Sequence, residues 1–311
     1  MSDILVIGSA NMDLVAFADR LPQPGETVAG AFQSFEGGKG ANQAVAASRA
    51  GGKVAFLGRV GLDVFGARLR ESLQDNGVDT RFVGEVEGPS GVAIIMSGGG
   101  NNMIVVAPGA NNALGEEAIA ESSFAGARFV LAQLETPLPG IIKAARLAQE
   151  KAATFILDPA PARPLPRELL VRVDWLTPNE SEAAALLGVT ELGDPLMAAR
   201  KLKALGPRGV VLKLGGEGVV LLEDNSPALV PARKVHAVDT TAAGDAFNGA
   251  FAVALAEGKP AMAAVNFAIA AAAISVTRHG AQPAMASRDE IDAFLKGLDT
   301  NPDAPSHSGK L

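Results

Sequence analysis

Cysteine is absent from this chain of 311 residues, and histidine occurs only three times. Without cysteine there can be no disulfide bond, no thiol nucleophile and no metal site built on thiolates. Three scattered histidines also disfavour a zinc site. Disulfide-stapled scaffolds and cysteine-dependent enzymes are therefore excluded.

Positive charge is scarce as well: 27 lysine and arginine residues face 34 aspartate and glutamate residues, which gives a net charge of −7. A protein that binds nucleic acid needs a basic surface to replace the counterions of the phosphates. The chain has no basic stripe, so its composition argues against nucleic acid as a partner and favours a small metabolite.

Long apolar runs are the third scarcity. Residues 261–276 form such a run, interrupted only by Asn266 and Ser275, and they fall short of the roughly 18 residues that a membrane-spanning helix requires. We expect a buried, alanine-rich core helix there, packed on the helix that follows Asp245, and no membrane partner. Asp3 directly precedes a strand pattern, which is unlike a signal peptide, and a cytoplasmic location is expected.

Hydrophobic residues make up 48% of the chain and charged residues 20%, as in globular proteins with a substantial core. Short β-branched runs alternate with helical patterns, which predicts an α/β fold: a doubly wound, mostly parallel central sheet with helices on both faces. The expected strands are nearly continuous in apolar residues, as burial on both faces requires, and cover residues 4–8, 54–57, 129–134, 154–157, 175–177 and 210–214.

Two regions interrupt this alternation. Residues 14–35 and 91–108 are predicted to form a small accessory β-sheet, the second region as a hairpin around the glycine-rich stretch 98–102. We expect one domain over residues 1–299, with the small sheet inserted in the α/β core. The tail, residues 300–311, is polar and expected to be flexible.

The sequence Asp239-Thr240-Thr241-Ala242-Ala243-Gly244-Asp245 stands directly before a helical run. Small residues there let a ligand approach the main chain, and the first turn of a helix offers free N–H groups to a phosphate. Asp245 would then be a base beside an anion hole. Alternatively, Asp245 is an ordinary helix N-cap. The residues alone leave these two interpretations evenly matched.

A second glycine-rich segment, residues 37–43, opens an alanine-rich helix. A P-loop would need glycine and a hydroxyl where the chain has Gln33 and Gly40, and a dinucleotide fingerprint would need glycine where it has Gln43. Both interpretations fail. A loop remains whose glycines permit close approach and whose Lys39, Asn42 and Gln43 can hydrogen-bond a polyhydroxy ligand.

In order and spacing, these two segments and several others resemble the signatures of the ribokinase-like (PfkB) family of carbohydrate kinases, over nearly the whole chain: residues 6–13, 24–27, 37–47, 133–135, 158–162, 177–180, 239–249 and 277–283. The resemblance implies ATP-dependent phosphorylation of D-ribose at the 5-hydroxyl, and a homodimer formed through the small sheet as a lid. Another pentose such as deoxyribose, or a nucleoside, is the alternative substrate. A sugar-sensing protein without catalysis is disfavoured by the intact anion hole, residues 242–245.

The resemblance assigns Asp245 as general base and gives the sugar and the nucleotide two sets of residues. Those for the sugar are Asn11, Met12, Asp13, Gly38, Lys39, Gly40, Ala41, Asn42, Glu135 and Asp245. Those for the nucleotide are Asn179, Lys213, Leu214, Gly215, Gly216, Glu217, Gly218, Ala242, Ala243, Gly244, Asp245 and Ile269. Most lie where expected strands end, at the edge of an open sheet where ligands bind. Simpler roles remain open: turn-forming side chains for Asn11 and Asp13, and a solvated loop end for Glu135.

Two metal sites are also implied by the resemblance. Glu182 would act on Mg²⁺ through water, with Asn179 beside it, although Glu182 could equally serve the helix dipole. K⁺ or another monovalent cation would bind mostly backbone carbonyls of Asp239, Thr241, Ser275, Arg278, Gly280 and Ala284, leaving the guanidinium of Arg278 free. The chain departs from the family pattern at Lys213, where threonine is common, at Ile269, often polar, and at Ala284, which lacks a hydroxyl.

Overall fold

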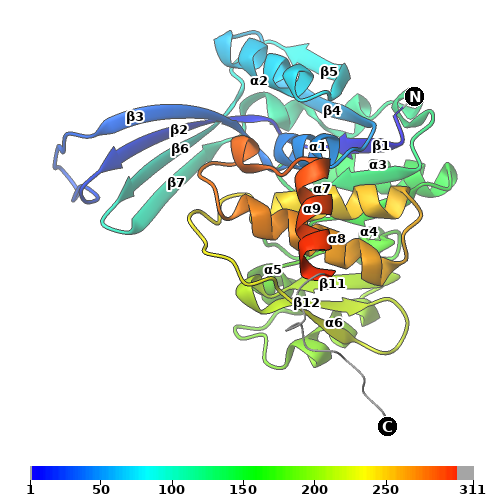
Figure 1. Cartoon of the computed structure of the whole chain (residues 1–311). Coiled ribbons are helices and arrows are strands. Elements are labelled where there is room, and N and C mark those ends of the chain that lie inside the picture. The colour runs from blue at the N-terminus through cyan, green and yellow to red at the C-terminus, as the bar shows by residue number, and fades with distance from the viewer. Residues whose placement is uncertain (1, 300–311) are drawn as a thin grey trace.

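The central sheet of the computed structural model, which describes residues 2–299, has nine strands in that part of the chain (Figure 1). Their order is β13-β12-β11-β10-β9-β8-β1-β4-β5, parallel from β5 to β11 and antiparallel at the β11-β12-β13 edge. The strands are β1 Ile4–Ile7, β4 Val54–Gly61, β5 Asp79–Val86, β8 Phe129–Ala132, β9 Thr154–Leu157, β10 Trp175–Leu176, β11 Gly209–Lys213, β12 Gly218–Leu222 and β13 Ala228–Pro231. The doubly wound, mostly parallel sheet is therefore confirmed.

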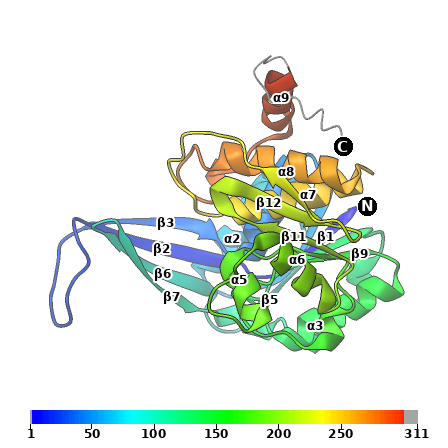
Figure 2. The same cartoon turned by 90° about the horizontal axis from the view of Figure 1, so that it is seen from below.

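Helices cover both faces of this sheet, which is why its inner strands are apolar throughout (Figure 2). One face packs against α1 Lys39–Arg49, α2 Val64–Asp75, α7 Ala243–Ala256, α8 Ala261–Ser275 and α9 Arg288–Asp299. The other packs against α3 Leu138–Glu150, α4 Arg167–Leu170, α5 Glu180–Leu187 and α6 Pro195–Ala204. Short 3-10 turns join them: η1 Gly109–Ala113, η2 Glu116–Ala118, η3 Glu121–Phe124, η4 Gly215–Glu217 and η5 Gln282–Ala284.

The alanine-rich run predicted to be a core helix is α8, and its neighbour is α7, as expected. Helix α7 also packs closely on α1. A Cβ on Gly249 would come within 2.7 Å of the carbonyl oxygen of Gln43, so glycine at this position permits the close approach. This close approach brings the amino ends of α1 and α7 together. No helix in residues 2–299 is long and apolar enough to cross a membrane.

A second sheet, the lid, projects from the edge of the main body (Figure 1). Its order is β3-β2-β6-β7, with β2 Asn11–Ala18, β3 Ala31–Gly37, β6 Gly91–Gly98 and β7 Asn101–Ala107. The regions 14–35 and 91–108 thus leave the central sheet, and the lid reaches further than expected, to Asn11 and Gly37. A tight turn at Gly99 and Gly100, both with positive φ, closes the hairpin. The predicted tail, 300–311, lies outside the described residues.

Candidate active site

The candidate site lies where the amino ends of α1 and α7 meet the carboxyl ends of β1 and β8. Helix α1 starts directly on the turn after β1: a Cβ on Gly40 would lie 2.6 Å from the backbone nitrogen of Ser9. Gly38, with φ 88°, leaves equally little room beside the nitrogen of Asn11. Only glycine permits this packing, and it places Lys39 and Asn42 over the end of the sheet.

Asp245 belongs to the first turn of α7 but does not cap it. The N-cap is Ala242, at φ 57°, which has no side chain able to accept a hydrogen bond. The buried carboxylate of Asp245 instead accepts from Asn42 Nδ2 at 3.1 Å and Gln43 Nε2 at 2.9 Å, both on α1. The N-cap interpretation is therefore wrong.

The backbone N–H groups of Gly244 and Asp245 make no hydrogen bond to another residue in the part of the chain that the structure describes. They lie at the positive end of the α7 dipole, in a segment of small residues. Such free amides are suited to a phosphate or to charge that develops on one. These free amides support the anion hole expected at residues 242–245, which stays a prediction.

Burial and neighbouring charges shift the ionisation of this cluster. The pKa of Asp245 is raised to about 6 overall: burial raises it most, the ammonium of Lys39 opposes this rise, and the charge of Asp158 adds to it. The pKa of Asp13 rises to about 7, first through burial and then through the charges of Glu135 and Asp245. For Lys39, burial lowers the pKa, but surrounding carboxylates, led by Asp245, outweigh it and raise the pKa overall. A base with a pKa near neutrality suits proton transfer.

The predicted sugar residues come from four elements. Asn11 and Asp13 stand on β2, Lys39 and Asn42 on α1, Glu135 follows β8, and Asp245 lies on α7. Glu135 Oε2 accepts from Ser9 Oγ at 2.6 Å and from the backbone nitrogen of Lys39 at 3.0 Å. It is therefore no solvated loop end. The Asn11 side chain accepts from Asn111 Nδ2 at 2.7 Å rather than from its own backbone.

Some predicted sugar residues can contribute only main-chain atoms to a ligand. The side chain of Met12 is fully buried in the core, and Gly38 and Gly40 have none. Ala41 is buried in the first turn of α1. Met12 lies on β2, and Gly38 to Ala41 form the N-cap and first turn of α1, so their backbones border the cluster.

Several residues that hold the cluster are outside the predicted sugar and nucleotide sets, although the sequence indicates that Gln43 can hydrogen-bond a polyhydroxy ligand. Gln43 Nε2 donates to both Asp245 and Asp158, at 2.9 and 2.8 Å, and its oxygen accepts from Gln133 Nε2 at 2.6 Å. Asn111, on η1, donates to Asn11 from a hundred positions away in the chain. Gln43, Gln133 and Asp158 stand inside recognised motifs, which is a signal that could have found them. Asn111 has no such signal.

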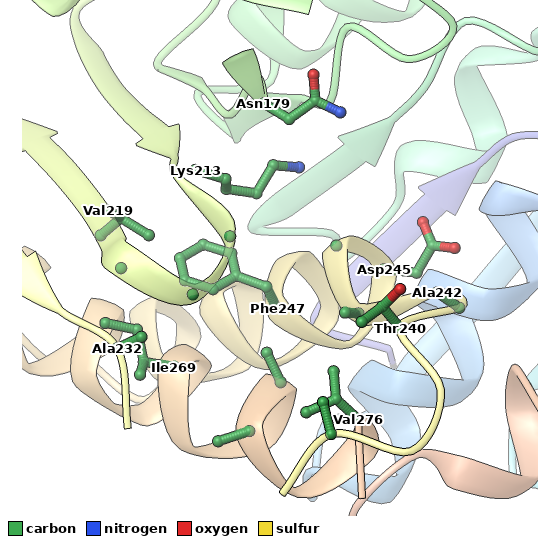
Figure 3. A pocket seen from close by; sticks show the side chains of 18 of the residues that line it. Asn179, Lys213, Val219, Ala232, Thr240, Ala242, Asp245, Phe247, Ile269 and Val276 are labelled. Carbon is green, nitrogen blue, oxygen red and sulfur yellow. The ribbon is translucent and has the colours of Figure 1, made fainter. Parts of the chain in front are cut away.

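A pocket of about 790 Å³ extends from Asp245 toward the antiparallel edge of the sheet (Figure 3). Of the predicted nucleotide residues, Leu214 and Glu217 do not line it: Leu214 is buried and Glu217 is exposed on η4. The others do, as do Lys39 and Glu182. Apolar side chains that the sequence analysis missed form the wall away from Asp245: Val219, Ala232, Val235, Phe247, Ala272, Ala273 and Val276. This wall suits a flat aromatic base, and the polar end suits phosphates.

The residues expected to act on Mg²⁺ form a capping box at the start of α5. Asn179 Oδ1 accepts from the backbone of Glu182, and Glu182 Oε2 accepts from the backbone of Asn179 at 2.7 Å. No cluster of three or more acidic or histidine side chains able to hold a metal occurs within residues 2–299. Asn179 and Glu182 both line the pocket, and their side-chain oxygens are of the kind that binds Mg²⁺, which keeps several waters and borrows phosphate oxygens.

The residues expected at the monovalent cation bring two loops together. Asp239 accepts from the backbone nitrogens of Thr241 and Gly280, both at 2.9 Å; burial opposes ionisation, but these bonds lower the pKa of Asp239 overall. Ser275 is buried, and its hydroxyl donates to the carbonyl of Ala272. Ala284 is buried and offers only its backbone. The guanidinium of Arg278 was expected to be free, but in the structure it pairs with Glu290.

Comparison with known proteins decides the family. The family model for the pfkB family carbohydrate kinases matches residues 1–288. The chain belongs to the pfkB family. Among pfkB relatives, the ribokinase of Bacillus subtilis is 42% identical over 95% of this chain and 100% of its own length. The deoxyribokinase of Salmonella typhi is 36% identical over 94% of this chain and 98% of its own. A structure of Arabidopsis thaliana ribokinase complexed with ribose and ATP aligns with a TM-score of 0.89 and 35% identity, covering 95% of this chain and 99% of that one.

Proposed function

We propose that this chain phosphorylates the 5-hydroxyl of D-ribose with ATP, giving D-ribose 5-phosphate and ADP. The observation that carries the proposal is the position of Asp245. Its buried carboxylate lies between a polar cluster, suited to sugar hydroxyls, and a pocket whose polar end begins with free helix amides. One carboxylate therefore stands where an attacking hydroxyl and a phosphate can meet.

In this proposal the amides and carboxylates of Asn11, Asp13, Asn42 and Glu135, with Lys39, orient the ribose hydroxyls. Asp245 accepts the proton of the 5-hydroxyl as the 5-oxygen of ribose attacks the terminal phosphorus of ATP and ADP leaves. The free amides of Gly244 and Asp245 bind the negative charge that develops on the transferring group. Positioning and electrostatics supply most of the catalysis in such reactions.

The remaining predicted residues complete the nucleotide and metal sites. Residues 213–218, Ile269 and the start of α7 would hold the nucleotide. Asn179 and Glu182 would hold the water shell of Mg²⁺, which, when bound, neutralises phosphate charge. K⁺ or another monovalent cation would bind beside the anion hole, at Asp239, Thr241, Ser275, Arg278, Gly280 and Ala284. Because Ala284 has no hydroxyl, a water molecule would complete that shell.

We further propose a homodimer in which the lid sheets of two copies pair. Its basis is the apolar surface of β6 and β7, where Ile94, Met103, Ile104, Val105 and Val106 are all exposed in one chain. Such a surface is typical of protein interfaces. The cytoplasmic location expected from the sequence stays a prediction.

A deoxyribokinase activity is the second candidate, because a deoxyribokinase is 36% identical to this chain. A coupled assay of ADP release over a panel of pentoses, 2-deoxyribose and nucleosides separates the two. A buried polar group that loses its partner costs about 1–3 kcal/mol, so kcat/KM for ribose should exceed that for 2-deoxyribose by roughly 5- to 150-fold. Equal or better turnover of 2-deoxyribose or of a nucleoside would overturn the ribose assignment.

A further inference from the structure

Lys213 is a cation that the fold places inside the pocket, close to the start of α7. It is the last residue of β11, and its side chain reaches toward the part of the pocket where Asn179 and Asp245 lie (Figure 3). Its ammonium is 3.0 Å from Asp158 Oδ1 and 3.5 Å from the position that a Cβ would take on Gly244. The side chains of Lys213 and Asp158 are only 13% and 3% exposed.

Asp158 holds Lys213 from a fixed position. Its second oxygen accepts from Gln43 Nε2 at 2.8 Å, and the same nitrogen donates to Asp245. Lys213, Asp158, Gln43 and Asp245 thus form one hydrogen-bonded chain across the site. A lysine ammonium has three donors, and that of Lys213 has Asp158 as its one partner among residues 2–299.

This end of the pocket needs positive charge. Three carboxylates line it, those of Asp158, Glu182 and Asp245, and each would repel a phosphate. Of the four basic residues that line the pocket, Arg233 and Lys234 follow Ala232, which lies at the far end from Asp245 (Figure 3). Lys213 lies beside the start of α7, where charge would develop during phosphoryl transfer.

We propose that Lys213 is a catalytic residue whose ammonium binds the transferring phosphoryl group of the nucleotide, and that Asp158 is the positioning residue that aims it. This role rests on the proposed phosphoryl transfer. A purely structural role is the competing explanation, in which Lys213 only neutralises the buried charge of Asp158.

Four variants separate these roles: Lys213→Met, Asp158→Asn, the two combined, and Lys201→Met as a control for the loss of one positive charge on the exposed side of α6. Lys213→Met should lower kcat by roughly 10²- to 10³-fold and lower the unfolding temperature, because buried Asp158 loses its only cationic partner among residues 2–299. The double variant should regain the unfolding temperature but not kcat. Asp158→Asn alone should lower kcat less than Lys213→Met and leave ribose affinity unchanged. Lys201→Met should match the wild type.

Calorimetry adds a readout that does not depend on turnover. If Lys213 binds the terminal phosphoryl group, Lys213→Met should weaken a non-hydrolysable ATP analogue about tenfold more than it weakens ADP. Equal weakening of both nucleotides, or a double variant with wild-type kcat, would overturn the proposal. A wild-type protein that phosphorylates no sugar would overturn the proposed function instead, and the contrast between the two nucleotides would still test Lys213.

Discussion

Asp245 carries a charge in a buried position, and its neighbours determine how easily it takes a proton. Burial alone disfavours the carboxylate, while the amides of Asn42 and Gln43 and the ammonium of Lys39 favour it. The balance leaves a pKa of about 6. A carboxylate at this value is mostly ionised at neutral pH and still basic enough to accept a proton from an attacking hydroxyl.

We predict that Asp245→Asn lowers kcat by roughly 10²- to 10⁴-fold while ribose affinity stays within a few-fold, because the amide keeps the shape but cannot accept the proton. Steady-state kinetics and calorimetry with ribose measure the two quantities. Asp289→Asn, an exposed acid in the first turn of α9, is the matched control and should be nearly neutral. Near-normal kcat in the Asp245 variant, with ribose still bound, would remove Asp245 from the mechanism.

The raised pKa values of Asp13 and Asp245 predict opposite effects of pH on activity and stability. Activity needs ionised Asp245, so kcat/KM should fall as the pH drops through about 6. Stability should move the other way. Between the ordinary value of 3.8 and about 7 the folded state binds more protons at Asp13 than the unfolded state does, so this contribution to the free energy of unfolding grows as pH falls and is lost as pH rises through 7.

Urea unfolding of the ligand-free protein at pH 5 and pH 8 checks this sign. The Asp13→Asn variant should lose much of the difference between the two pH values that the wild type shows. An Asp13→Asn variant with the full wild-type difference would mean that Asp13 titrates at its ordinary value in the folded protein.

At the scale of elements, the edge hairpin of the lid, β6 and β7, exposes apolar side chains to solvent. Every residue of β7 is exposed, and Ile94 on β6 pairs with Val105 on β7 in the same hairpin. This hairpin forms one edge of the four-stranded lid, and its exposed apolar side chains are typical of an interface. The lid therefore gains most from a partner that covers this face.

We predict that Ile94→Glu combined with Val105→Glu converts the protein to a monomer and raises KM for ribose, because charges desolvated in the interface oppose association. Light scattering at micromolar concentration and steady-state kinetics measure both effects. Met262→Glu, an exposed position at the start of α8, is the control and should leave assembly unchanged. A wild-type protein that is a stable, active monomer would contradict the proposed dimer.

Which elements the sequence predicts depends on whether local pattern or tertiary contact determines them. The inner parallel strands are predictable because burial on both faces leaves apolar runs, and the start of α7 because small residues precede it. Strands β5, β12 and β13 lie outside the predicted set. The edge strand β5 is only partly buried and has no continuous apolar run, and an apolar run such as that of β12 does not reveal an antiparallel edge. Asn111 is missed for a related reason: its contact with Asn11 exists only after the lid and the main body have met.

At the scale of the whole molecule, the sugar cluster is a junction between two sheets. Asn11 and Asp13 belong to the lid through β2, whereas Asn42, Glu135 and Asp245 belong to the main body. The two parts are joined by contacts such as Asn111 with Asn11 and Arg68 of α2 with Glu36 of β3. A sugar bound by both sides would add hydrogen bonds across this junction.

We therefore predict that ribose slows amide hydrogen exchange in β2 and in β6, whose Gly91 pairs with Asn11, even though β6 contributes no predicted sugar residue. Ligand binding raises the free energy of every opening that releases the ligand, and strand pairing extends this protection from β2 to β6. ADP alone is the control and should protect residues 213–218 and 240–245 while leaving the lid unchanged. Ribose that protects only α1 and α7, with β2 and β6 exchanging as in the free protein, would show that the sugar is held by the main body alone.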